Sequence, residues 1–95
     1  PSEVVDQFTK GADIVKIFPA ATVTANYFKQ LAGPLGHLPL MAVGGINAKN
    51  GADFINAGAD YLGIGSGMFK KEDVVNGDFK AMTNSVREFE YALNL

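Results

Sequence analysis

Short, almost wholly apolar runs alternate along the chain with segments in which apolar residues recur every three or four positions. The runs are rich in β-branched residues and bounded by glycine or proline, which is typical of buried strands, and they cover residues 14–18, 40–43 and 61–64. The periodic segments predict four helices: Ser2 to Gly11, about Thr24 to about Ala32, Asn47 to Gly58, and from about Asp78 onward.

Strands that are apolar throughout and separated by helices indicate a parallel sheet covered by helices, and therefore an α/β fold. Their spacing, about 20 to 30 residues, suits the βα units of a barrel or of an open sheet. Gly-Ala-Asp stands before both the first and the third strand, at residues 11–13 and 58–60. Each copy marks the end of a helix followed by the start of a strand.

The connecting segments have their own signals. Residues 19–23 are expected to form a loop, Gly33-Pro34 to end the second helix, and residues 70–77 to form a linker. Side chains that suit a helix N-cap open three of the helices: Ser2, Thr24 and Asn47. The last helix carries an amphipathic stripe that we expect in the core: Phe79, Met82, Val86, Phe89 and Leu93.

The composition, 47% hydrophobic and 19% charged residues over 95 positions, is that of an ordinary globular domain. A net charge of −2 without a basic cluster argues against nucleic acid as a partner. No apolar run approaches the roughly 20 residues that cross a membrane. The absence of cysteine excludes thiolate metal sites and agrees with a cytoplasmic location, and a single histidine, His37, argues against a histidine-based metal site.

Three parallel strands would leave two unpaired sheet edges and one uncovered face, which is a poor fold for an independent domain. The chain also begins at Pro1 rather than at methionine. We therefore expect residues 1–95 to form a single partial domain, completed by strands from another part of the protein or from another copy.

Lys16 is the most informative residue, because two apolar residues flank it on each side within a predicted strand. Strand alternation puts Ile14, Lys16 and Phe18 on one face, and Val15 and Ile17 on the other. If the second pair faces the helices, Lys16 points into a barrel whose cavity Phe18 also lines. An amine in apolar surroundings is a nucleophile toward carbonyl carbons. Schiff-base chemistry and a simple ionic role at the barrel mouth both remain open.

Glycines follow the second and third strands directly, as Gly44-Gly45 and as Gly65-Ser66-Gly67. The carboxyl ends of parallel strands carry the site in α/β folds, so both loops are expected on the side of Lys16. Glycine lets backbone N–H groups approach an anion closely, and a following helix start adds partial positive charge. A tight turn explains either loop alone, but the two together favour a phosphate or another anion.

Other polar and aromatic residues carry weaker signals. His37 lies in a loop rich in glycine and proline and is expected to be exposed. Asp13 and Asp60 begin strands, at the end opposite to the proposed site, and are expected to form caps or turns. Tyr27 and Phe28 are expected in the core.

The segment Gly11-Ala12-Asp13-Ile14-Val15-Lys16-Ile17-Phe18-Pro19-Ala20 resembles the Schiff-base lysine segment of the bacterial 2-keto-3-deoxy-6-phosphogluconate aldolases, which also act as 4-hydroxy-2-oxoglutarate aldolases. Three further segments follow in that family's order and at its approximate spacing: Ala32-Gly33-Pro34-Leu35, Gly44-Gly45-Ile46-Asn47 and Gly63-Ile64-Gly65-Ser66. The resemblance covers essentially the whole chain. Its lysine segment is specific, whereas Gly-Gly-Ile occurs in many phosphate-binding barrels.

This resemblance implies the C-terminal part of a (β/α)8 TIM barrel, with strands six to eight and their flanking helices. It implies a metal-independent class I aldolase of carbohydrate metabolism (the Entner-Doudoroff type), a lyase without cofactor and usually a homotrimer. Such enzymes cleave 2-keto-3-deoxy-6-phosphogluconate to pyruvate and glyceraldehyde 3-phosphate, and 4-hydroxy-2-oxoglutarate to pyruvate and glyoxylate.

The resemblance also implies residue roles. Lys16 would form the imine with pyruvate or the phosphorylated keto acid. Backbone donors of Gly44 and Gly45 would bind the phosphate, with Gly65 and Ser66 completing that pocket. Three further positions are expected to contact substrate: Phe18, Pro19 and Val43.

Two positions depart from the family pattern. Val43 stands where many relatives have threonine and where relatives that act on the galactonate epimer can carry valine, so the epimer stays open. Gly65-Ser66-Gly67 stands where Gly-Gly-Ser is usual, which moves the hydroxyl one position earlier. The general-base glutamate of the family belongs to its first strands, so residues 1–95 alone are expected to be inactive.

Two other functions remain as alternatives. One is a different phosphate-binding barrel enzyme, similar to thiamine-phosphate synthase or hexulose-phosphate synthase, in which Lys16 is an ionic ligand. The other is a non-catalytic α/β module used for assembly or anion binding. Covalent trapping of a keto acid on Lys16 separates the aldolase from both.

Overall fold

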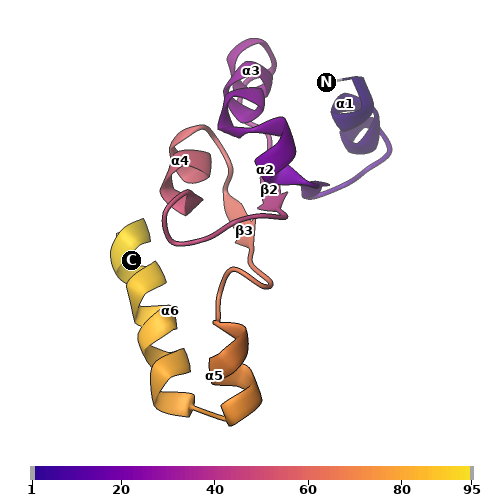
Figure 1. Cartoon of the computed structure of the whole chain (residues 1–95). Helices are drawn as coiled ribbons and strands as arrows, with labels where there is room; N and C mark the ends of the chain where they lie inside the picture. Colours follow the sequence, from indigo (N-terminus) through magenta and orange to yellow (C-terminus); the bar gives the residue numbers. More distant parts are fainter. Residues whose placement is uncertain (1, 95) are drawn as a thin grey trace.

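The computed structural model describes residues 2–94. Its elements are α1 (Ser2–Thr9), β1 (Val15–Ile17), α2 (Ala20–Val23), α3 (Ala25–Leu35), β2 (Leu40–Val43), α4 (Gly51–Asn56), β3 (Tyr61–Gly63), α5 (Lys71–Asn76) and α6 (Phe79–Leu93) (Figure 1). The strands form a parallel sheet in the order β1-β2-β3, which confirms the predicted α/β class. β1 and β3 are shorter than predicted, and β2 has its predicted bounds.

The two faces of the sheet differ as strand alternation predicts. Val15 and Ile17 are buried, whereas Lys16 between them is exposed. The strand register places Lys16 opposite Met41 and Met41 opposite Tyr61, so these three residues form one row across the open face. The face behind them carries the hydrophobic core, which packs against helices.

The core is centred on two aromatic rings. Phe28 of α3 and Phe54 of α4 lie with ring centroids 5.4 Å apart and planes 84° to one another. Phe28 is 0% exposed, and burying a side chain of this kind contributes about 1.5–3 kcal/mol. The buried cluster around the two rings draws on α1 to α4, on β1 and β2 and on the adjoining loops: Val4, Val15, Ile17, Ala20, Leu31, Leu40, Ala42, Ile46, Ala57 and Ala59.

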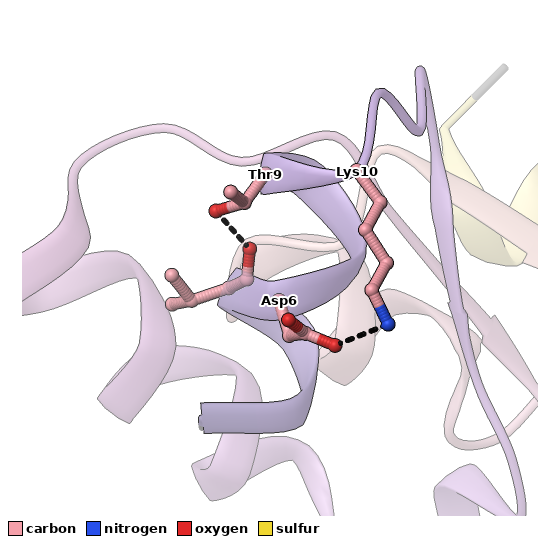
Figure 2. A network of polar contacts seen from close by, with 4 residues as sticks. Asp6, Thr9 and Lys10 are labelled. Carbon is pink, nitrogen blue, oxygen red and sulfur yellow. Dashed lines mark hydrogen bonds and ion pairs between the residues drawn. The ribbon is translucent and has the colours of Figure 1, made fainter.

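Helix α1 lies beside β1, with Val4 buried and Phe8 packed against the core. Two contacts stabilise its C-terminal end, and each joins residues one helical turn apart (Figure 2). Lys10 Nζ lies 2.9 Å from Asp6 Oδ2, and the Thr9 hydroxyl donates a 3.0 Å hydrogen bond to the Val5 carbonyl. Ser2 is the first helical residue rather than the cap that we predicted.

The prediction of a loop at residues 19–23 is wrong, because α2 occupies this segment. Val23 N–H donates to the Pro19 carbonyl and Thr24 N–H to the Ala20 carbonyl. The helix docks on the sheet through Ala20, which is fully buried. Four small or β-branched residues give no helical period, and this contact with the sheet decides their conformation.

The predicted start of α3 is confirmed, since Thr24 is its N-cap residue and the helix begins at Ala25, but the predicted end at about Ala32 is wrong. Thr24 makes no side-chain cap bond, because it also ends α2 and its backbone is left-handed (φ 72°). The helix continues through Gly33-Pro34 to Leu35, and Gly36 (φ 73°) follows as its C-cap. A proline removes only one helical hydrogen bond, so the chain ends its helix where a glycine supplies the positive φ.

The predicted linker at residues 70–77 contains α5. Glu72 and Asp73 in its first turn complement the positive end of a helix, and Gly77 (φ 65°) ends it in a left-handed conformation. Apolar periodicity could not reveal this helix, since none of its residues is buried.

Helix α6 begins as predicted, with Asp78 accepting a 3.1 Å hydrogen bond from Ala81 N–H as N-cap. The prediction that its whole apolar stripe is core is wrong. Phe89 is 4% exposed, but Phe79 is 76% exposed. Figure 1 shows the reason: α5 and the first turns of α6 extend away from the sheet, and only the C-terminal part of α6 returns to α4.

Candidate active site

Because the three strands are parallel, the loops that follow them lie at one edge of the sheet. Lys16 lies one residue before the end of β1, on the open face. Gly44-Gly45 follow β2 and Gly65-Ser66 follow β3, with Ile64 between β3 and the second pair. The structure thus places the predicted lysine and both glycine loops on the same side of the fold.

Lys16 lines a pocket of about 350 Å³ at the free edge of β1. Phe18, which is 65% exposed, lines the same pocket, but so do Val15 and Ile17, so this pocket lies at the strand edge and does not separate the two faces. Glu3 of α1 and Tyr27 of α3 also contribute to it. No local sequence signal shows that α1 packs beside β1, so the place of Glu3 in this pocket could not be found from the sequence.

The loop after β2 is pressed against the loop after β1. A Cβ on Gly44 would lie 2.9 Å from the Phe18 ring, and a Cβ on Gly45 would lie 2.5 Å from Ala21 Cβ. Ala21 N–H also donates a 3.0 Å hydrogen bond to the Gly44 carbonyl. These contacts require glycine at both positions for packing, which is a reason beyond the tight turn or the anion site considered from the sequence.

The loop after β3 packs against the other side of the β2 loop. Gly67 lies against the Ile46 carbonyl so closely that a Cβ there would overlap the oxygen. Gly65 has open space around its α-carbon and is exposed, as is Ser66. Sequence reasoning selected Gly65 and Ser66, but the sterically required glycine of this loop is Gly67.

Backbone donors in these loops are available for a ligand. Among residues 2–94, the N–H groups of Gly45, Ile46, Ser66 and Gly67 have no protein acceptor. Ile46 differs from the other three residues, because its side chain belongs to the core and the residue is only 2% exposed.

Two asparagines hold the turn between this loop and α4. Asn47 Oδ1 accepts from Lys49 N–H at 2.8 Å and from Asn50 N–H at 3.0 Å. Asn47 was predicted to cap the helix, and it caps this preceding turn instead, since α4 begins only at Gly51. Asn50 Nδ2 donates to the Gly45 carbonyl at 2.8 Å, a contact that the sequence pattern did not indicate.

The weaker candidates lie away from the strand ends that carry the loops. His37 is exposed as predicted, and its Nε2 lies 3.2 Å from Asp60 Oδ2. This pair joins the approach to β2 with the start of β3, which suits a structural contact. Phe28 is in the core as expected, and Tyr27 is half-buried beside it.

Residues 2–94 contain neither a cluster of metal-ligating side chains nor a helix suited to crossing a membrane. No group of three or more histidine, aspartate or glutamate side chains in this part of the chain is arranged to hold a metal ion. None of its helices combines the length and the apolar character that a membrane crossing needs.

Comparison with known proteins agrees with the geometry. The family model described as KDPG and KHG aldolase matches residues 1–85. The 2-dehydro-3-deoxy-6-phosphogalactonate aldolase of Escherichia coli is 33% identical over 70 residues, which are 73% of this chain and 34% of that protein. A thiamine-phosphate synthase of Acidithiobacillus ferrooxidans is 37% identical over 90 residues, which are 84% of this chain and 42% of that protein.

Among solved structures, one described as native KDPGal superposes with a TM-score of 0.76 at 28% identity. The superposition covers 99% of this chain and 46% of that one. The chain therefore spans less than half the length of these relatives. With its family model matched from residue 1 to residue 85, the chain belongs to the KDPG and KHG aldolase family.

Proposed function

We propose that the protein is a class I aldolase that cleaves a 2-keto-3-deoxy-6-phospho sugar acid to pyruvate and glyceraldehyde 3-phosphate through an imine at Lys16. The observation that carries the proposal is the position of Lys16. Lys16 lies on the open face between two buried residues, near the end of β1. Gly44 and Gly45 follow the neighbouring strand β2 at the same edge of the sheet. Family membership supports the same chemistry.

In the proposed reaction, the Lys16 amine attacks the C2 carbonyl of the keto acid and water leaves, which forms an iminium ion. The C3–C4 bond then breaks, its electron pair moves toward the iminium nitrogen, and the C4 hydroxyl loses its proton to a base. The aldehyde departs, C3 of the enamine is protonated, and water releases pyruvate and regenerates the amine. We expect groups outside residues 1–95 to supply the base, so this stretch alone is inactive.

The phosphate is assigned to the loops after β2 and β3. Gly45, Ile46, Ser66 and Gly67 offer N–H groups that have no acceptor within residues 2–94. Backbone donors of this kind suit phosphate oxygens. Phe18 and Pro19 would line the space between this site and the imine, since Phe18 shares the Lys16 pocket and both residues contact the Gly44 position.

Reductive trapping tests the imine directly. The full-length protein is incubated with pyruvate and borohydride, and the modified lysine is located by peptide mass spectrometry. We expect one adduct, on Lys16. The Lys16→Arg variant should lose the adduct and about three orders of magnitude or more in activity. Lys10→Arg, which alters the exposed lysine directly after α1, should keep both the adduct and the activity. An adduct on any lysine other than Lys16 would overturn the assignment.

Val43 and the relatives favour the galactonate epimer over the gluconate epimer. Val43 lies on the open face directly before Gly44. The Escherichia coli relative is named for its 2-dehydro-3-deoxy-6-phosphogalactonate substrate. We expect kcat/KM to be higher for that epimer, and Val43→Thr to shift the ratio toward the gluconate epimer by about tenfold. Assays with the two pure epimers measure this ratio of kcat/KM values. A further assay uses 4-hydroxy-2-oxoglutarate as the unphosphorylated substrate.

A second candidate function has one specific observation in its favour. The thiamine-phosphate synthase of Acidithiobacillus ferrooxidans matches 84% of this chain, more than the 73% that the Escherichia coli aldolase matches. In an enzyme of that kind, Lys16 would bind an anion without forming a covalent bond. Absence of any pyruvate adduct, together with an effect of Lys16→Arg on phosphate binding alone, would favour this second function.

A further inference from the structure

We propose that Asn50 is a positioning residue of the phosphate site, which it serves by fixing the peptide that presents the Ile46 N–H to the ligand. The inference rests on the proposed function, because it assumes that the loop after β2 binds the phosphate. Nothing in the sequence pattern separates Asn50 from an ordinary residue at the start of a helix.

The first observation is what the Asn50 side chain does. It occupies the N-cap position of α4 but makes no cap hydrogen bond to that helix. Its amide instead turns back along the chain: Nδ2 donates to the Gly45 carbonyl at 2.8 Å, and Oδ1 accepts from Asn47 N–H at 2.8 Å. Both functional atoms are thus engaged by the loop after β2, which leaves little rotational freedom to the side chain.

The second observation concerns the peptide that Asn50 holds. The Gly45–Ile46 bond is trans, so its carbonyl and N–H point in opposite directions within one plane. A hydrogen bond to the Gly45 carbonyl therefore fixes the direction of the Ile46 N–H. That N–H has no acceptor within residues 2–94.

The third observation is that this peptide would otherwise be free to rotate. Gly45 has a positive φ (73°), and a glycine visits both signs of φ with similar ease. Ala21 leaves no room for a side chain at Gly45, and Gly67 lies against the Ile46 carbonyl, but neither neighbour holds the Gly45 carbonyl. Among residues 2–94, Asn50 makes the only hydrogen bond to that carbonyl.

The chain offers a matched control. Asn47→Ala removes two hydrogen bonds of the same turn but leaves both Asn50 side-chain contacts, because Asn47 uses its backbone N–H to reach Asn50. Asn50→Ala releases the Gly45 carbonyl. A purely structural role predicts equal effects of the two substitutions, whereas a positioning role predicts a difference in phosphate recognition.

The experiment measures inorganic phosphate binding by calorimetry, and aldol cleavage of phosphorylated and unphosphorylated keto acids, for the full-length wild type and both variants. We expect Asn50→Ala to weaken phosphate binding about tenfold, with a matching rise in KM for the phosphorylated substrate. Its kcat, and its kcat/KM for 4-hydroxy-2-oxoglutarate, should stay within about twofold. Asn47→Ala should change phosphate binding less than threefold.

The outcomes separate this inference from the proposed function. The role of Asn50 is overturned if Asn50→Ala lowers kcat/KM equally for both substrates, or if it binds phosphate as tightly as the wild type. Pyruvate trapping on Lys16 would still support the aldolase in either case. Wild-type protein that binds no phosphate overturns the inference and the phosphate site together. If Asn50→Ala does not fold, Asn50→Asp keeps the acceptor for Asn47 N–H and removes only the donor, with Asn56→Asp as the charge control on an exposed residue.

Discussion

The sheet with helices α1 to α4 and the hairpin of α5 and α6 contain similar amphipathic segments but bury them to different extents. Phe28 of α3 is 0% exposed, and Phe79 of α6, which also belongs to an apolar stripe, is 76% exposed. Phe28 packs against Phe54 of α4 in the core, whereas Figure 1 shows the start of α6 far from the sheet. An apolar stripe thus indicates which side of a helix requires a partner, but not whether the nearby chain supplies one.

The space beside β3 sharpens this comparison. A cavity of about 600 Å³ lies between β3 and the C-terminal part of α6, lined mainly by apolar side chains that include Leu62, Val86 and Leu93. The same strand has one hydrogen-bonded neighbour, β2. The hairpin therefore meets the rest of the fold across a loosely filled region, and its stability depends more on local contacts than that of the sheet region.

The largest expected effect on the free energy of unfolding comes from the first of two matched phenylalanine substitutions. Phe28→Ala should lower the free energy of unfolding by about 3–5 kcal/mol, because it removes a ring packed against Phe54 and leaves a cavity. Phe79→Ala should change it by less than about 0.5 kcal/mol. Urea unfolding of the full-length protein measures both. A large effect at Phe79 would show that another part of the protein covers it.

A second pair compares two glycines that both have positive φ. Gly45→Ala should cost about 1–3 kcal/mol more than Gly77→Ala, since only the first brings a new Cβ to 2.5 Å from Ala21. Gly77 has open space around it, so its substitution carries the cost of the left-handed backbone alone. Equal midpoints in thermal unfolding would mean that the loops after β1 and β2 separate easily.

The N-cap of α6 tests the hairpin itself. Asp78→Ala removes the acceptor of the Ala81 N–H bond and should cost about 1 kcal/mol. Because α6 has few buried contacts at this end, the loss should appear as faster hydrogen exchange in its first turns while exchange in the sheet stays the same. Asp78→Asn, which keeps a capping oxygen, is the control. Faster hydrogen exchange throughout the protein would contradict an effect confined to the start of α6.

The smallest effect is expected on α1. Lys10→Ala breaks the exposed pair with Asp6 (Figure 2) and should cost about 0.3–0.5 kcal/mol, less in high salt. The comparison of unfolding midpoints at low and high ionic strength measures it. A salt-independent loss would assign the effect to helix packing instead.

The extent to which sequence predicts this molecule depends on how local the deciding contacts are. The exposure of Lys16 between Val15 and Ile17 follows from alternation within one strand, and the parallel sheet follows from the order of its elements. The helix α2 and the exposure of Phe79 were not predictable, because they depend on docking against distant parts. Asn50 falls within the helix predicted from Asn47 to Gly58, and only the structure shows its bond to the Gly45 carbonyl.

The contacts around the loop after β2 have a consequence for how such a site can change over time. Gly44 touches Phe18 of one neighbouring loop, and the Ile46 carbonyl touches Gly67 of the other. Substitutions in the three loops should therefore be strongly non-additive, since neighbouring residues share the same space. A new substrate preference would require coordinated exchange of all three loops, and single-loop grafts between distant relatives should fail even where each loop is functional in its own background.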